Sequence, residues 1–299
     1  MKKIFSFLLI GTFTLYLSCS QDSETKEASF EGAKNIILLI GDGMGVTQVY
    51  AAMTVSESPL NMVEFPYSGL QKTNSLTDYI TDSAASGTAI ASGNKTKNGV
   101  IGQDTLGNAF KSILHIAEEN GLSTGLVSTS SVTHATPAAF IAHELSRNDY
   151  EAIAADFLDT DIDLFIGGGY NHFANRNDGL NLVDSLKARK YQVTERMSEV
   201  NQIESGKVAG FTAEGHNPRY SEGRGDMLPQ ATGKAIELLN KNDKGFFLMV
   251  EGSQIDWGGH DNDINYVLEE TLDFDRAVGI ALDFAKNDRN TLVVVTSDH

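Results

Sequence analysis

Runs of consecutive apolar residues constrain this chain most strongly, because a strand that is apolar at every position must be covered on both faces. The runs that read as strands are residues 36–40, 125–127, 164–166, 246–250 and 292–295. Stretches with helical spacing of apolar residues separate them, at residues 113–120, 149–157, 228–240 and 265–285. This alternation predicts an α/β fold, a three-layer sandwich whose central, mostly parallel sheet carries helices on both faces.

The N-terminus has the pattern of an export signal. Two lysines precede an apolar run at residues 4–17, which is too short for a membrane-spanning helix. Cys19, the only cysteine, follows this run and resembles the lipidation site of bacterial lipoproteins; plain signal cleavage is the alternative. We therefore expect a signal peptide at residues 1–19, a polar, flexible tether at 20–33, and a protein exported to the periplasm or lipid-anchored to the bacterial envelope.

The remaining residues, from about 34 to 299, suffice for one large domain without internal repeats. The formal net charge of −17 leaves no basic stripe that could neutralise a nucleic-acid backbone, so we expect no nucleic-acid partner. Small phosphorylated substrates stay possible, because bound metals can neutralise their charge locally. Contact with a membrane is expected only through a lipid anchor, and a homodimer is left open.

Three of the apolar runs end in acidic groups. Asp42 follows the run at 36–40, Glu251 follows the run at 246–250, and Asp298 closely follows the run at 292–295. Parallel strands would bring these three carboxylates to one edge of the sheet, where they would repel one another. The sequence therefore predicts a cation between them. The glycines at 41, 43 and 45 lack the spacing of a dinucleotide-binding loop.

The types of ligand suggest which cations bind. A mixture of imidazole and carboxylate groups suits zinc, and the chain offers Asp256, His260, Asp298 and His299. Asp256 and His260 are four residues apart, so a helical turn would place them on one face. Asp42 and Glu251, with a hydroxyl or water, offer only oxygen, which suits magnesium.

Residues 81–89 are typical of a serine at the start of a helix. Asp82 suits the N-cap position, and the free N–H groups of the first helical turn favour an anion. Ser83 could there attack a phosphate. An ordinary capped helix explains this stretch equally well by itself, but the acidic strand ends make a catalytic site the better interpretation.

Five segments resemble the alkaline phosphatase family and occur in the order found in that family: 40–45 (IGDGMG), 81–86 (TDSAAS), 134–139 (HATPAA), 250–252 with 255–256 (VEG and ID), and 296–299 (TSDH). They extend over nearly the whole chain after the tether. The resemblance implies hydrolysis of phosphate monoesters through a phosphoserine, with two zinc ions and one magnesium ion.

The resemblance also implies a role for each matching position. Ser83 would be the nucleophile, and Arg147 would clamp the phosphate with Asp82 orienting it. His134 and Trp257 stand at positions that vary within the family and would tune the affinity for phosphate and magnesium.

Seven residues would bind the metals: Asp42, Thr136, Glu251, Asp256, His260, Asp298 and His299. Asp42, Asp298 and His299 would hold the zinc that activates the nucleophile. Asp256 and His260 would contribute to the second zinc. Asp42, Thr136 and Glu251 would bind magnesium.

One difference from the family concerns the C-terminus. The family has a further zinc-ligand histidine, in a His-Thr-Gly segment well beyond the Asp-His pair, whereas this chain ends at His299. We therefore expect a catalytic domain at 34–299 that is incomplete at its C-terminus and weakly active or inactive. Two other functions stay open: a phosphodiesterase or sulfatase on the same scaffold, and a non-catalytic metal-binding lipoprotein.

Overall fold

The computed structural model describes residues 32–299, and the architecture below is that of the compact unit formed by Ala33–His299. The predicted signal peptide, Cys19 and nearly all of the predicted tether lie outside the described residues. Within the described part of the chain, no helix is long and apolar enough to cross a membrane.

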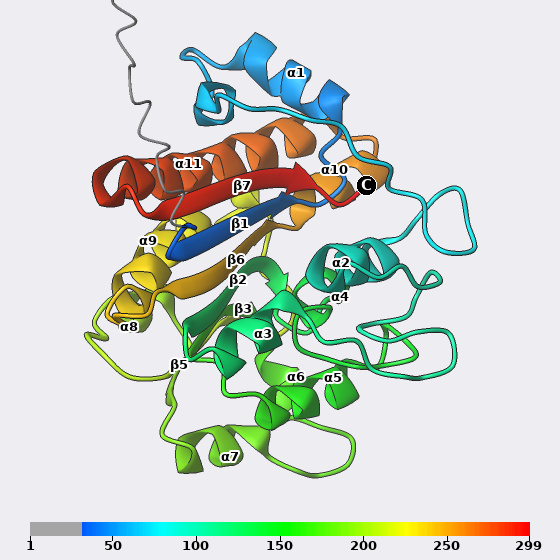
Figure 1. Cartoon of the computed structure of the whole chain (residues 1–299), viewed down its shortest axis with the longest axis vertical. Helices are drawn as coiled ribbons and strands as arrows, with labels where there is room; N and C mark the ends of the chain where they lie inside the picture. The colour runs from blue at the N-terminus through cyan, green and yellow to red at the C-terminus, as the bar shows by residue number, and fades with distance from the viewer. Residues whose placement is uncertain (1–31) are drawn as a thin grey trace, which may run out of the picture. The chain divides into compact units, whose positions relative to one another are not determined.

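A seven-stranded sheet forms the centre of the unit, in the order β4-β5-β3-β2-β6-β1-β7 (Figure 1). Every neighbouring pair of strands is parallel. The strands are β1 (Asn35–Gly41), β2 (Ser123–Ser131), β3 (Leu164–Gly168), β4 (Gln192–Thr194), β5 (Val208–Ala213), β6 (Phe246–Gly252) and β7 (Thr291–Ser297). The predicted parallel sheet is confirmed, and β4 and β5 are additions that the apolar runs did not predict.

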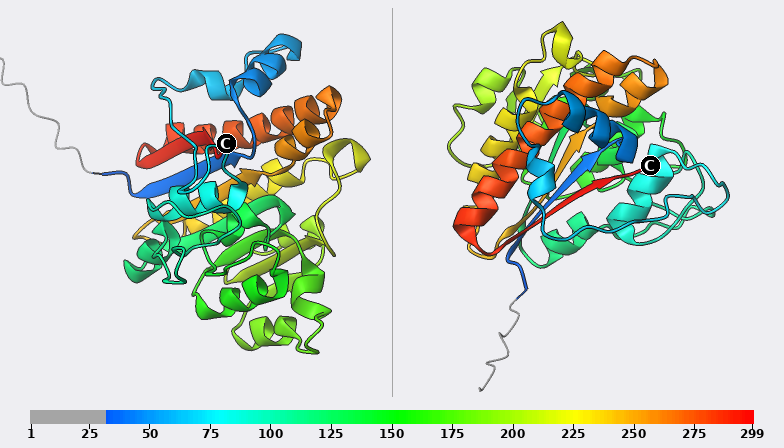
Figure 2. Two further views of the ribbon diagram at one scale, coloured as in Figure 1. Left: turned by 90° about the vertical axis from the view of Figure 1, so that its right-hand side faces the viewer. Right: turned by 90° about the horizontal axis from the view of Figure 1, so that it is seen from above.

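The helices lie on the two faces of this sheet (Figures 1 and 2). The α-helices are α1 (Val46–Val55), α2 (Ser83–Ser92), α3 (Ile113–Glu119), α4 (Ala135–Ala138), α5 (Tyr150–Asp156), α6 (Tyr170–Ala174), α7 (Leu182–Ala188), α8 (Met197–Val200), α9 (Met227–Leu239), α10 (Gln254–His260) and α11 (Ile264–Asp288). Short 3₁₀ helices are η1 (Asn61–Glu64), η2 (Phe157–Asp159) and η3 (Tyr220–Glu222).

Two hydrophobic cores, one on each face of the sheet, explain the continuous apolar strands. In β1, Leu38 and Ile40 pack into the core that also contains residues of α2 to α7. Ile37 and Leu39 pack into the other core, which contains residues of α9 and α11. Successive side chains of a strand point to opposite faces, so both faces of β1 have to be apolar. The three-layer prediction is therefore confirmed.

The edge strand β7 is covered on one face only. Val293 and Val295 pack against the core that contains α9 and α11. Leu292 and Val294, on the opposite face, are 48% and 37% exposed. The expectation that an apolar run is buried on both faces therefore holds for β1 but is wrong for β7.

A buried ion network fastens the segment before α9 to α11. Both amino groups of Arg224 donate to Glu270, at 3.0 and 2.6 Å, and Nη2 also donates to Asp273 at 2.8 Å. All three side chains are almost completely buried. Removing one partner from a buried ion network leaves uncompensated charge, which costs more than the network itself contributes.

We predict that Arg224→Ala lowers the free energy of unfolding by about 3–5 kcal/mol, because Glu270 stays buried without a cation and Asp273 keeps only its pair with Arg276. Urea unfolding followed by circular dichroism measures this change. Lys111→Ala is the control, since the Lys111–Glu119 ion pair is more than half exposed and should contribute less than about 1 kcal/mol. Equal effects of the two substitutions would contradict the prediction.

Candidate active site

The acidic strand ends meet as the sequence predicts. Strand β1 lies between β6 and β7, and Gly41 is in register with Gly252 on one side and Ser297 on the other. The side chains of Asp42, Glu251 and Asp298 are therefore close together, and all three residues are at most 1% exposed. Burial, and then the charges of Asp298, Glu251 and Asp256, raise the pKa of Asp42 well above its usual range.

Ser83 opens α2 directly beside this cluster. Its Oγ lies 3.4 Å from each carboxylate oxygen of Asp42 and 3.5 Å from Nε2 of His299. Asp82 is the N-cap, as predicted, and its carboxylate accepts from the Ala85 N–H at 3.0 Å. The helix start thus fixes the Ser83 hydroxyl next to a group of potential metal ligands.

A first group of ligand atoms consists of Asp42, Asp256 and His299, whose nearest ligand atoms all lie within 4.8 Å of one another. Nε2 of His299 is 3.1 Å from Asp42 Oδ1, 3.8 Å from Asp298 Oδ2 and 4.0 Å from Asp256 Oδ1. His260 pairs with Asp256 at 3.4 Å, on one face of α10, and is largely exposed. The structure thus places Asp256 between the residues predicted for the two zinc sites.

A second group consists of Asp42, His134 and Glu251, all buried, with ligand atoms again within 4.8 Å of one another. Burial is the largest effect on the pKa of His134, which falls to about 3, so this imidazole is neutral and able to coordinate a metal. Sequence reasoning gave His134 only a tuning role, whereas the structure puts it among the potential ligands.

Three buried atoms near this group have no hydrogen-bond partner within the described part of the chain: His134 Nδ1, Thr136 Oγ1 and Glu251 Oε1. Buried polar atoms are nearly always paired, so several together require an explanation. A divalent cation would satisfy such atoms, because imidazole nitrogen, hydroxyl oxygen and carboxylate oxygen are all common metal ligands. The residues present therefore fit a metal ion.

Arg147 lies on the solvent-facing side of the site and contacts both Asp82 and His134. Its Nη1 donates to Asp82 Oδ2 at 3.0 Å, and its Nη2 lies 3.3 Å from Nε2 of His134. About a quarter of the Arg147 side chain is exposed, so its guanidinium can still reach a ligand from solution. Asp82 therefore links the start of α2 to this arginine.

A tryptophan ring of α10 packs against two histidine rings beside the site. The ring of Trp257, one residue after Asp256, lies 5.8 Å from His134 and 4.9 Å from His216, measured between centroids. His216 received no functional role from the sequence. Its loop, residues 214–218, carries no spacing pattern that would have indicated proximity to Trp257.

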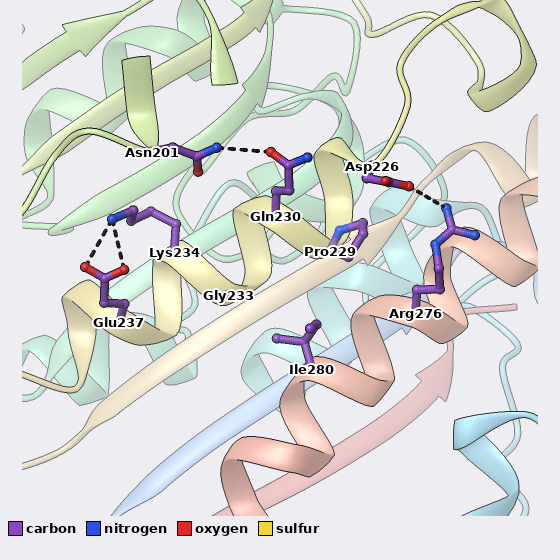
Figure 3. A pocket seen from close by; sticks show the side chains of 9 residues that line it. All are labelled: Asn201, Asp226, Pro229, Gln230, Gly233, Lys234, Glu237, Arg276 and Ile280. Atoms are coloured by element: carbon purple, nitrogen blue, oxygen red, sulfur yellow. Dashed lines mark hydrogen bonds and ion pairs between the residues drawn. The ribbon is translucent and has the colours of Figure 1, made fainter. Parts of the chain in front are cut away.

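A separate hollow of about 550 Å³ lies between α9 and α11, and Figure 3 shows the residues that line it. Its charged side chains pair with each other, Lys234 with Glu237 and Arg276 with Asp226. The two groups of potential metal ligands lie elsewhere, at the strand ends. We therefore place the candidate active site at the carboxyl ends of β1, β6 and β7.

Burial of the carboxylates predicts a specific pH dependence. Burial raises the pKa of Glu251 from 4.5 to about 7, against the effect of the nearby hydroxyls of Ser128, Ser253 and Thr136. The folded state therefore holds a proton that the unfolded state releases, and stability must fall as pH rises between these values.

We predict that the metal-free chain loses free energy of unfolding between about pH 4.5 and 7, and that Glu251→Gln flattens this slope. Urea unfolding in EDTA at stepped pH measures both effects. Added divalent cation should restore stability above pH 7, because it binds the ionised carboxylates. If the free energy of unfolding falls with pH equally steeply in the wild type and in Glu251→Gln, Glu251 is not the group whose titration causes the fall.

Comparisons with known proteins agree with this geometry. The family model for alkaline phosphatase matches residues 33–299. Alkaline phosphatase 3 of Bacillus subtilis is 41% identical, over 92% of this chain and 63% of its own length. Alkaline phosphatase of Escherichia coli is 36% identical, over 89% of this chain and 70% of its own length.

Solved structures give the same result. Alkaline phosphatase from the Antarctic bacterium TAB5 superposes with a TM-score of 0.86 and 44% identity, over 90% of this chain and 79% of that chain. A histidine-to-aspartate variant of the TAB5 enzyme, solved with magnesium in its M3 site, gives the same TM-score at 43% identity. The chain thus belongs to the alkaline phosphatase family.

Proposed function

We propose that this protein hydrolyses phosphate monoesters and that Ser83 is transiently phosphorylated. The observation that carries the proposal is the position of Ser83 Oγ, 3.4 Å from both oxygens of Asp42, the one residue shared by the two groups of potential metal ligands. The curated relatives, which this chain spans for about two thirds of their length, support the same activity by their names.

Zinc and magnesium are the cations we propose. One zinc would be held by Asp42, Asp298 and His299, and a second by Asp256 and His260. Asp42, Thr136 and Glu251 would hold magnesium. His134 would add a nitrogen ligand, which zinc accepts more readily than magnesium does, once Arg147 Nη2 no longer donates to its Nε2 and the ring proton moves from Nδ1 to Nε2. When bound, such ions polarise the phosphoryl group and favour the alkoxide form of the nucleophile.

The residues of the chain perform the remaining steps. The start of α2 aims Ser83 Oγ at the phosphorus, and a new O–P bond forms as the bond to the leaving group breaks. Arg147, held by Asp82, donates two N–H groups to the phosphoryl oxygens. Water then hydrolyses the phosphoserine. Recognition centred on the phosphoryl group leaves the rest of the substrate loosely bound, so we propose a broad range of small monoesters.

A phosphodiesterase or sulfatase is the main alternative. Arg147 and the oxygen ligands Thr136 and Glu251 favour the monoester, because its extra negative charge can be met by one more cation and by a bidentate guanidinium. Turnover of matched monoester, diester and sulfate substrates distinguishes these activities. Metal binding without any turnover would instead support a non-catalytic lipoprotein.

We predict that Ser83→Ala lowers turnover by roughly 10³-fold or more and abolishes phosphoenzyme trapping, because the substitution removes the hydroxyl that lies beside Asp42. Ser92→Ala, at the far end of the same helix, is the matched control and should label like the wild type. Acid quenching with ³²P-labelled substrate followed by peptide mapping gives the result. A label on another residue, or one that survives Ser83→Ala, would refute the proposal.

Export and lipid anchoring at Cys19 are proposals that rest on the sequence alone. Two or more acyl chains give stable anchoring, whereas one gives only marginal binding. Membrane fractionation of a Cys19→Ser variant tests the anchor, and unchanged association with the membrane would disprove it.

A homodimer is supported by an exposed apolar face of α1. Val46, Tyr50 and Met53 lie on one side of this helix, and Tyr50 is 70% exposed. Exposed apolar patches of this kind are typical of interaction sites. We propose that α1, which packs on α11 (Figure 1), faces a second copy of the chain.

We predict that Tyr50→Lys converts a dimer into monomers, because a charge would be buried at the interface. Sedimentation velocity measures the change. Leu106→Lys, which places the same charge at a residue 85% exposed in a loop, is the control and should leave the dimer intact. A monomeric wild type, or a dimeric Tyr50→Lys variant, would contradict the proposal.

A further inference from the structure

The structure assigns a positioning role to three buried serines, Ser128, Ser130 and Ser253. We propose that they form a hydroxyl cradle that fixes the Glu251 carboxylate, so that one oxygen is held by the protein and the other is presented to a divalent cation. The inference rests on the proposed metal site and extends it to residues that no pattern in the sequence indicated.

The cradle begins with two short hydrogen bonds to one oxygen. Ser128 on β2 is in register with Glu251 on β6, and its Oγ donates to Oε2 at 2.6 Å. Ser253, two residues after Glu251, donates to the same Oε2 at 2.6 Å. All three residues are 0% exposed. The protein therefore uses two donors on Oε2.

Proton counting shows why these donors are directed at Glu251. A serine hydroxyl carries one proton and two lone pairs. The backbone N–H of Ser130 donates to Ser128 Oγ at 3.0 Å and to Ser253 Oγ at 3.1 Å, which occupies a lone pair of each. Ser130 Oγ, 2.9 Å from Ser128 Oγ and 3.0 Å from Ser253 Oγ, is a second possible acceptor for each hydroxyl. Both hydroxyls lie closer to Glu251 Oε2, at 2.6 Å, and a carboxylate is the stronger acceptor, so their protons are directed at Glu251.

The other oxygen of Glu251 has the opposite surroundings. Oε1 is buried and makes no hydrogen bond of normal geometry to a described residue; the group nearest to partnering this carboxylate besides the serines is the hydroxyl of Thr136, itself a potential ligand, which lowers the pKa of Glu251. Glu251 belongs to the ligand group with Asp42 and His134. A purely structural serine cluster would give no reason for this asymmetry. Two donors on one oxygen and none on the other are what a carboxylate needs in order to coordinate a metal through Oε1.

The backbone of β2 is irregular at the position of Ser128 and Ser130. The pairing of β2 with β3 shifts register between Val127 and Ser131, so the serines lie at an irregularity of the strand. Gly167 of β3 allows this, because a Cβ there would come within 3.0 Å of the Ser128 carbonyl oxygen and 3.2 Å of the Ser130 carbonyl oxygen. Such irregularities are frequent beside active sites, where they redirect side chains.

The test measures metal affinity. Wild-type chain, Ser128→Ala and Ser253→Ala are dialysed to equilibrium against graded Mg²⁺ or Zn²⁺, and bound metal is quantified by elemental analysis. Loss of a residue that orients a ligand typically weakens binding 10–100-fold, and we expect that loss for one ion per chain while other bound ions are retained. Thr271→Val is the matched control, because it also removes a buried hydroxyl, bonded to Val267 on α11.

The outcomes separate the inference from the proposed function. Wild-type affinity in both serine variants would overturn the cradle alone. A wild-type chain that binds no divalent cation would overturn the metal site and the cradle together. Weakened binding in Thr271→Val of the same size as in the serine variants would also overturn the cradle, since the effect would then be general loss of stability. The two serines are tested separately, so one variant that fails to fold leaves the other to decide.

Discussion

The crowding of three buried carboxylates at the ends of adjacent parallel strands is the constraint on which the rest of the structure depends. Asp42, Glu251 and Asp298 are brought together by the strand order β6-β1-β7, and water is excluded from all three. Burial, and then the charge of Asp298, raise the pKa values of Asp42 and Glu251. A fold that accepted this arrangement without compensation would be destabilised at neutral pH, so the site is best understood as a set of ligands arranged for cations.

The side chains around these three carboxylates are of two kinds: potential metal ligands, and residues that fix the position of other residues of the site. Asp82 shows the second kind most clearly: it caps α2 through the Ala85 N–H, accepts from the Gly99 N–H at 2.9 Å, and pairs with Arg147. One carboxylate thereby fixes the start of α2 and Arg147 relative to each other. In the cradle we propose, the serines around Glu251 Oε2 would act on a metal ligand in the same way, from the side opposite Oε1.

Much of this arrangement could be predicted from the sequence, because the apolar runs are long and the acidic residues follow them directly. The runs identified β1, β6 and β7, and Asp82 with Ser83 identified the start of α2. Strands β4 and β5 were missed because β4 has only three residues and β5 mixes glycine, alanine and threonine with its apolar residues. The serine cradle and the ligand position of His134 depend on contacts between distant segments, for which a single sequence carries no signal.

Crystals grown with zinc and magnesium would show whether Asp42 is shared between two cation sites at the strand ends, with zinc located by its anomalous scattering and magnesium by its electron density and octahedral oxygen ligands. We expect zinc peaks beside Asp42, His299 and Asp256, and a further cation between Asp42 and Glu251 Oε1. Crystals in which Asp42 contacts no cation, or in which Glu251 Oε1 lies at hydrogen-bond distance from a neighbouring carboxylate instead of a cation, would contradict this arrangement.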